Sequence, residues 1–182
     1  MGIIIAIVII ALLVLWVISV QRKLVNQDEL CQNAMSTIGV QQESRWDALT
    51  GMVELIKSYN EHEYNTIKDV IAQRAVINGG STAAAADAQE NMITQALGKI
   101  IAIAEQYPDL QANENYAKTM DSVNLYENQV RMSRMVYNDT VTVFNREVRQ
   151  FPTNLIAKML GFFEKDYLKV DAAKTEMPSM KI

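Results

Sequence analysis

The fold of this chain is decided by residues 114–150, ENYAKTMDSVNLYENQVRMSRMVYNDTVTVFNREVRQ. Alternating steps of four and three residues select one helix face, formed by Tyr116, Met120, Val123, Glu127, Val130, Arg134, Tyr137, Val141, Phe144 and Val148. This heptad spacing predicts a long helix that packs against other helices through an apolar face. Only Glu127 and Arg134, two opposite charges, interrupt that face.

Prolines mark both ends of this predicted helix. The helix before it ends at Pro108, because the residue preceding a proline is pushed out of the helical region. After the long helix, Pro152 favours the start of a short fourth helix over 153–160, which Gly161 closes. We expect the folded domain to end near residue 163 and 164–182 to form a C-terminal tail, although Phe162, Phe163, Tyr167 and Leu168 are apolar enough to dock on the bundle.

Two more long helices are predicted towards the N-terminus. Asn78-Gly79-Gly80 is a turn, and Ser81 or Thr82 can cap a helix that runs to residue 106. Before the turn, no proline or glycine-rich stretch interrupts the chain, so the first helix is expected to continue to Ile77. The predicted fold is therefore all-α: an antiparallel bundle of three long helices plus a short fourth, spanning residues 24–163. The second helix is expected to run back along the first.

The first helix begins as a membrane anchor, residues 1–23. Ile3 to Val20 contains only apolar residues apart from Ser19, and at about 1.5 Å per residue it covers roughly 27 Å, close to the thickness of a bilayer. It is too long for a cleaved signal and lacks preceding positive charge and a small-residue cleavage site. Arg22 and Lys23 follow this run after Gln21, which predicts a short N-terminus outside and a cytoplasmic C-terminal domain.

The stretch from Leu24 to about Thr50 is amphipathic, and on the expected helix lengths it has no partner inside its own chain. Isolated helices gain most of their stability by burying a face against another element. We therefore predict a homo-oligomer formed through this stalk and the anchor.

Charged and amide side chains at apolar positions predict a polar core. Glu127 and Arg134 lie about 10 Å apart along one face, which suits opposite charges from another helix. Because an unpaired buried charge is very costly, we interpret the set as a structural network, with a ligand site as the alternative. The predicted members are Arg45, Glu63, Arg74, Glu127, Arg134, Tyr137, Asn138 and Asn145. For the asparagines, the favoured role is hydrogen bonding to neighbouring helices, and the alternative is recognition of a partner.

The sequence offers no catalytic constellation, and no cofactor or metal site is predicted. His62 is the only histidine and Thr66 stands where a zinc-protease helix needs a second one. Cys31, the only cysteine, would lie roughly 45 Å from His62 on the same helix, so we interpret it as a small apolar residue of the packed face. A net charge of −4 gives no sign of nucleic-acid binding.

The chain resembles the LemA family of bacterial membrane proteins over nearly its whole length. The resemblance rests on the connector Ala104 to Glu114, on the helix from Glu127 to Pro152, and on Asn26, Arg45, Asp47, His62-Glu63 and Arg74. Within the connector, the family residues are Tyr107, Pro108, Asp109, Asn113 and Glu114. Family members usually carry an Ile-Pro-Asn-Leu type segment after Arg-x-Asp, whereas this chain has Ala48-Leu49-Thr50-Gly51. The loss of the proline favours a straight first helix here.

The resemblance implies an anchored helical domain and carries no established enzymatic activity. The preferred hypothesis is a non-enzymatic scaffold, single-pass in the bacterial inner membrane, that self-associates and organises or recruits protein partners at the cytoplasmic face. The alternative is a sensor or ligand-binding module whose polar core, around Glu63, Glu127 and Arg134, binds a small charged group.

Overall fold

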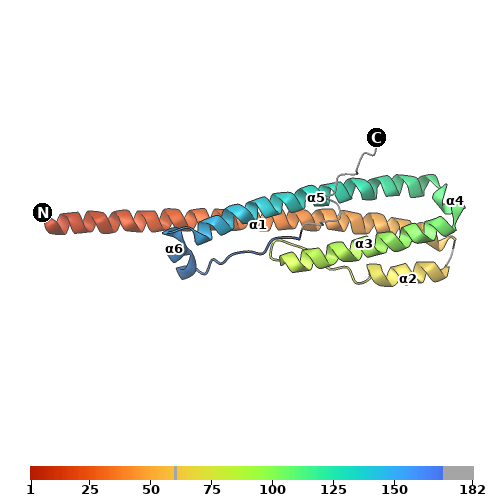
Figure 1. Cartoon of the computed structure of the whole chain (residues 1–182), viewed down its shortest axis with the longest axis horizontal. Helices are drawn as coiled ribbons and strands as arrows, with labels where there is room; N and C mark the ends of the chain where they lie inside the picture. Colours follow the sequence, from red (N-terminus) through yellow and green to blue (C-terminus); the bar gives the residue numbers. More distant parts are fainter. Residues whose placement is uncertain (60, 170–182) are drawn as a thin grey trace, which may run out of the picture.

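The computed structural model describes residues 1–59 and 61–169, and over this part of the chain it contains helices and no strand. The helices are α1 (Gly2–Lys57), α2 (Glu61–Ile71), α3 (Ala83–Gln106), α4 (Pro108–Gln111), α5 (Glu114–Arg149) and α6 (Thr153–Met159). The all-α prediction is confirmed, as are the long N-terminal helix and the short helix after Pro152. Together the helices form a narrow rod along α1 (Figure 1).

Helix α1 is the backbone of the rod. Its 56 residues correspond to about 84 Å of helix. By length and composition it can cross a membrane, and none of its most apolar window is buried inside the molecule. Figure 1 shows this first part of α1 projecting alone beyond α5 and α6. The same unbroken helix then enters the packed domain, where Leu24, Met35 and Ile38 are almost completely buried.

Helix α5 runs antiparallel to α1 along most of the domain. Lys23 Nζ lies 2.7 Å from Glu147 Oε1, and Arg45 Nη2 lies 3.8 Å from Glu127 Oε2, so the residue numbers descend along α5 as they rise along α1. The expectation that Leu24 to Thr50 has no partner within the chain is therefore wrong. With 36 residues, α5 is about 54 Å long, enough to cover the whole of that stretch.

The first helix ends at Lys57 and does not reach Ile77. Ser58 and Tyr59 make a turn in which their N–H groups donate to the carbonyls of Leu55 and Ile56. The chain then reverses into α2, whose Ile67 is completely buried. A straight helix would have carried Ile67 beyond the end of the bundle into water. The reversal of the chain after Lys57 buries Ile67 instead. This gain in apolar burial explains why the chain does not continue as a single helix to Ile77.

Because α2 has already reversed the chain, α3 runs parallel to α1, and the expected antiparallel pairing of these two helices is wrong. Gln42 bonds to the Ala86 carbonyl and Trp46 to the Gln89 side chain, so residue numbers rise together along both helices. The start of α3 agrees with the prediction, since Thr82 Oγ1 accepts a hydrogen bond from the N–H of Ala85.

Two apolar clusters fill the rod, and we name them by their distance from the N-terminal span. The proximal cluster joins α1, α5 and α6 with the start of α3, and its buried residues include Leu24, Cys31, Met35, Ile38, Ile77, Ala83, Ala86, Tyr137, Val141, Phe144, Val148, Ala157 and Leu168. The distal cluster joins α1, α2, α3 and α4 with the start of α5, and its buried residues include Trp46, Leu49, Met52, Ile56, Ile67, Ile93, Ile100, Leu110, Tyr116 and Val123. Seven of the ten positions on the predicted α5 face are buried, which confirms the heptad interpretation.

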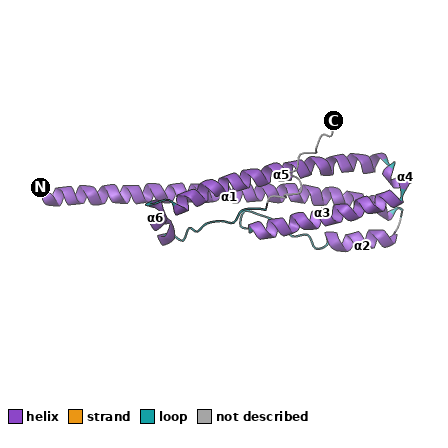
Figure 2. Ribbon diagram, in the orientation of Figure 1, coloured by secondary structure: helices purple, strands orange, loops and turns teal. Residues whose placement is uncertain are grey.

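Residues 162–169, here called the C-terminal segment, run back along the rod after α6 without helical structure (Figure 2). Leu168 is buried, and the Phe162 ring meets Phe144 edge to face with 6.3 Å between centroids. Phe163 and Tyr167 are exposed. Part of the expected tail is thus packed on the bundle, whereas the rest of that tail, residues 170–182, lies outside the described residues.

Candidate functional site

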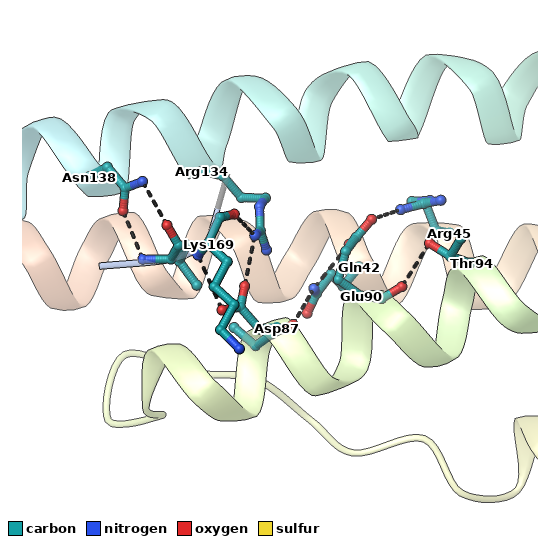
Figure 3. A network of polar contacts seen from close by, with 10 residues as sticks. Gln42, Arg45, Asp87, Glu90, Thr94, Arg134, Asn138 and Lys169 are labelled. Carbon is teal, nitrogen blue, oxygen red and sulfur yellow. Dashed lines mark hydrogen bonds and ion pairs between the residues drawn. The ribbon is translucent and has the colours of Figure 1, made fainter. Parts of the chain in front are cut away.

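A layer of polar side chains separates the two apolar clusters, and we call it the polar layer. It consists of Gln42 and Arg45 from α1, Asp87 and Glu90 from α3, and Glu127 and Arg134 from α5. Figure 3 shows these helices side by side with the polar side chains between them. The layer therefore sits where all three long helices meet.

Arg45 is the most deeply buried charge in the layer, with 1% of its surface exposed. Its guanidinium pairs with the carboxylate of Glu90 and, at 3.8 Å, with Glu127. Gln42 Nε2 donates to the other Glu90 oxygen at 3.2 Å and to the Ala86 carbonyl at 3.0 Å. Glu90 thus joins both α1 residues to α3. Because a buried cation must be paired, these contacts fix the register of α1 against α3 and α5.

Arg134 is paired with Asp87 rather than with a residue of the first helix. The distance from Arg134 Nη2 to Asp87 Oδ1 is 2.7 Å, and both side chains are mostly buried. The same Arg134 nitrogen donates to the carbonyl of Lys169 at 2.6 Å, and Asp87 Oδ2 accepts from the N–H of Lys169 at 3.2 Å. This ion pair therefore holds α3, α5 and the C-terminal segment together, as Figure 3 shows.

Asn138 and Asn145 of α5 bind the backbone of the C-terminal segment and not a neighbouring helix. Asn145 Nδ2 donates to the Lys165 carbonyl at 2.9 Å, and its Oδ1 accepts from the Lys165 N–H at 2.8 Å. Asn138 makes the same two bonds to Leu168, at 3.1 Å and 2.9 Å. Each amide thus satisfies both backbone groups of one residue. The favoured expectation, bonding between helices, is replaced by recognition of an extended chain.

Tyr137 of α5 also binds the backbone of the C-terminal segment. Its hydroxyl donates to the carbonyl of Asp166 at 3.2 Å. Burial, with smaller contributions from Cys31, Asp166 and Asp87, raises the pKa of Tyr137 to about 12, so the hydroxyl keeps its proton and remains a donor. Together Asp87, Arg134, Tyr137, Asn138 and Asn145 form what we call the segment-binding surface.

A cavity of about 330 Å³ lies beside the segment-binding surface. It is bounded by Cys31 and Met35 of α1, the turn at 79–82, and residues 164–166. Burial raises the pKa of the Cys31 thiol. Cys31 itself is buried in the proximal cluster, in agreement with its interpretation as an apolar packing residue.

Two predicted members of the polar core lie elsewhere. Arg74 lies in the stretch between α2 and α3 and pairs at 3.4 Å with Asp47, where both side chains are at least half exposed. Glu63 lies near the start of α2, which begins at the distal end of α1 (Figure 1). Because α1 ends at Lys57, it does not carry Glu63 and Arg74 alongside Glu127 and Arg134 of α5. Glu63, Glu127 and Arg134 therefore do not form one site.

The sequence interpretation missed Asp87 and Glu90, the two acids of α3. A signal for them was present, because they lie three residues apart on a helix whose alanines allow close approach to its neighbours. The predicted core also held three arginines, Arg45, Arg74 and Arg134, and only two carboxylates, Glu63 and Glu127. Choosing Asp87 and Glu90 required the direction of α3 relative to α1, which the periodicity does not contain.

The family connector has a structural role at the distal end. Pro108 and Asp109 start α4, and Tyr107 packs against the distal cluster. Asn113 Oδ1 accepts a hydrogen bond from the N–H of Asn115 at 2.8 Å, which caps α5. Glu114 pairs with Lys118 at 2.7 Å on the surface. These contacts position the start of α5.

The chemistry that this arrangement supports is binding. Its groups are amides, a phenol and paired charges, which hold backbone groups and fix helix register. Among the described residues, the buried atoms Gln42 Oε1, Arg45 Nε and Arg134 Nη1 have no hydrogen-bond partner. Burial of such atoms carries a desolvation cost, which the ion pairs and hydrogen bonds of the layer offset.

Comparison with known proteins gives a family and several relatives. The model of the LemA family matches residues 34–182. Protein LemA of Metamycoplasma hominis is 25% identical over 139 residues, which cover 76% of this chain and 63% of that protein. Magnetosome protein MamQ 2 of Paramagnetospirillum magneticum is 31% identical over 93 residues, or 51% of this chain and 33% of that protein. Magnetosome protein MamQ of Magnetospirillum gryphiswaldense is 31% identical over 72 residues, which cover 40% of this chain and 26% of that protein. The chain spans a third or less of the length of these magnetosome proteins.

Proposed function

Because this chain belongs to the LemA family, we propose that it is a non-enzymatic scaffold, anchored by one span in the bacterial cytoplasmic membrane, that self-associates and organises protein partners at the cytoplasmic face. The observation that carries the proposal is the continuity of α1. One helix, Gly2–Lys57, contains both the apolar span and the central helix of the packed domain. A domain built on the anchor helix is held at a fixed angle to the membrane, as a scaffold requires.

The orientation follows from charge. Arg22 and Lys23 follow the span after Gln21, and positive residues are retained on the cytoplasmic side. The domain then projects into the cytoplasm.

Self-association is better served by a surface other than the stalk, because many apolar side chains of the stalk, such as Leu24, Met35 and Ile38, are buried inside the chain. The outer face of α5 provides one. Leu125, Met132, Val136 and Val143 are between 40% and 58% exposed, and their spacing of seven, four and seven residues aligns them in one stripe. The stripe lies opposite the buried face of α5. We propose that it packs against the same stripe of a second copy.

The full-length chain in detergent tests this proposal by native mass spectrometry and crosslinking. We expect dimers or larger assemblies, and we expect Met132→Lys plus Val136→Lys to shift them to monomers. The matched control is Asn124→Lys plus Thr142→Lys, which adds the same charge to α5 about 100° away from the stripe. A wild-type chain that stays monomeric at high concentration would remove self-association from the proposal.

A further inference from the structure

The segment-binding surface holds a peptide almost entirely by its backbone. Seven hydrogen bonds from five side chains reach the N–H and carbonyl groups of residues 165, 166, 168 and 169. Side-chain contacts are few: Leu168 is buried in the proximal cluster, Lys165 Nζ pairs with Asp28 Oδ1 of α1 at 2.8 Å, and the exposed Glu164 pairs with Arg149 at 3.8 Å. The surface therefore fits an extended chain with one apolar and one basic position.

The spacing of the two asparagines matches an extended chain. Asn138 and Asn145 are two helical turns apart, or about 10.5 Å along α5. Lys165 and Leu168 are three residues apart, or about 10 Å in an extended chain. Each amide can therefore bind both backbone groups of its residue without distortion of the peptide. This agreement is what a built peptide site requires.

The segment is attached to the rest of the chain in a way that permits release. Phe162 donates to the Ala157 carbonyl, but among the described residues 163–169 make no backbone-to-backbone hydrogen bond. Gly161, with a positive φ of 79°, precedes the segment, and Leu160 and Phe163 on either side of it are exposed. Rotation at this hinge would free the segment without breaking a helix or a strand ladder.

We propose that the segment-binding surface of one copy accepts residues 164–169 of a second copy, so that neighbouring chains are linked by exchange of their C-terminal segments. The proposal deepens the proposed self-association and rests on it. The occupant is a second copy because residues 164–169 are the peptide seated on the surface, and every hydrogen bond broken in one chain is remade in the other. Exchange of an identical element in this way is a low-cost route to an oligomer.

The geometry of anchored rods favours exchange. Two copies in one membrane stand parallel, so the segment of one meets the surface of the other with the correct chain direction. Anchoring also raises the local concentration of neighbouring segments, which lets a second copy compete with the segment of the same chain.

The Lys165–Asp28 ion pair allows a direct test, because a carbodiimide joins contacting amines and carboxylates without a spacer. Full-length chains labelled with ¹⁴N and with ¹⁵N are mixed in detergent, equilibrated, crosslinked, digested and analysed by mass spectrometry. We expect crosslinks that join a light Asp28 peptide to a heavy Lys165 peptide and the reverse. If only light–light and heavy–heavy products form, exchange is excluded.

Two complementary variants sharpen the result. A chain with Asn138→Ala and Asn145→Ala has an impaired surface and an intact segment, and a chain with Leu168→Asp has an intact surface and an impaired segment. Each alone should lose the Lys165–Asp28 crosslink, and mixing them should restore it in one direction, from Lys165 of the first to Asp28 of the second. Circular dichroism checks that both chains remain helical. If both variants are folded and their mixture does not form the Lys165–Asp28 crosslink, the proposal is wrong.

The variant Met132→Lys plus Val136→Lys distinguishes association through the α5 stripe from exchange of the C-terminal segments. If dimers disappear in this variant and mixed crosslinks are absent from wild type, the α5 stripe alone carries association and exchange is wrong. If mixed crosslinks persist in it, exchange stands although the stripe is disabled.

Discussion

At the residue scale, the ion pair between Asp87 and Arg134 joins α3, α5 and the C-terminal segment. Asp87→Ala removes the carboxylate that pairs with Arg134 and accepts from the N–H of Lys169. Because it leaves a mostly buried guanidinium without that partner, we expect a loss of about 2–4 kcal/mol in the free energy of unfolding. Urea unfolding of the full chain in detergent, followed by circular dichroism, measures it.

A double-mutant cycle separates the pair from simple side-chain loss. Asp87→Ala combined with Arg134→Met removes both charges, so the double variant should lose less stability than the sum of the single variants. Strict additivity would show that the two side chains act independently and would contradict the interpretation.

Tyr137 predicts an alkaline limit to stability. Its pKa is raised to about 12 in the folded chain, above the ordinary value of about 10, so its contribution is complete below about pH 10 and is lost as the pH rises towards 12. Tyr137→Phe should cost about 1 kcal/mol at neutral pH through the lost hydrogen bond to Asp166, and should lose less stability than wild type between pH 10 and 12. If wild type and Tyr137→Phe lose the same free energy of unfolding between pH 10 and 12, the proposed role of Tyr137 is wrong.

At the element scale, the crossing of α1 by the chain at Ile77 makes two glycines of one helix unequal. A Cβ at Gly39 would lie 2.0 Å from the Ile77 carbonyl oxygen, whereas a Cβ at Gly51 would have no neighbour within 4 Å. Gly39→Ala should therefore destabilise the fold by about 1–3 kcal/mol through the forced shift of the crossing. The control Gly51→Ala should stabilise it by about 0.5–1 kcal/mol through helix propensity.

Urea unfolding measures the stability of Gly39→Ala and Gly51→Ala. If the two variants are equally stable, the chain does not cross α1 at Gly39. From the sequence, both glycines are isolated positions in a long helix and look alike. Only the contact with Ile77 distinguishes them, and that contact exists because the chain reverses after Lys57.

At the scale of the whole molecule, cysteine labelling can test the proposed orientation of the chain in the membrane. In a Cys31→Ser background, Gly2→Cys should react with a membrane-impermeant maleimide in intact cells. Asn128→Cys, on the exposed side of α5, should react only after permeabilisation. This pattern follows from the retention of Arg22 and Lys23 on the cytoplasmic side. Labelling of Asn128→Cys in intact cells would reverse the proposed topology.

The sequence by itself determined the features that depend on local pattern. The apolar run before Arg22 defines the candidate span, the heptad spacing of residues 114–150 defines the buried face of α5, and Thr82 and Pro108 mark helix ends. Each is set by residues within a few turns of one another, through backbone sterics, capping and the period of the helix.

Tertiary structure decided which elements meet. The reversal at Lys57, the parallel course of α3, and the selection of Asp87 and Glu90 as partners of the buried arginines all depend on burial between distant parts of the chain. The clearest case is Asn138 and Asn145, whose spacing in the sequence is that of any polar helix face. Their partner is an extended segment 20 to 30 residues away, and its backbone groups leave no signature in the sequence because every residue carries them.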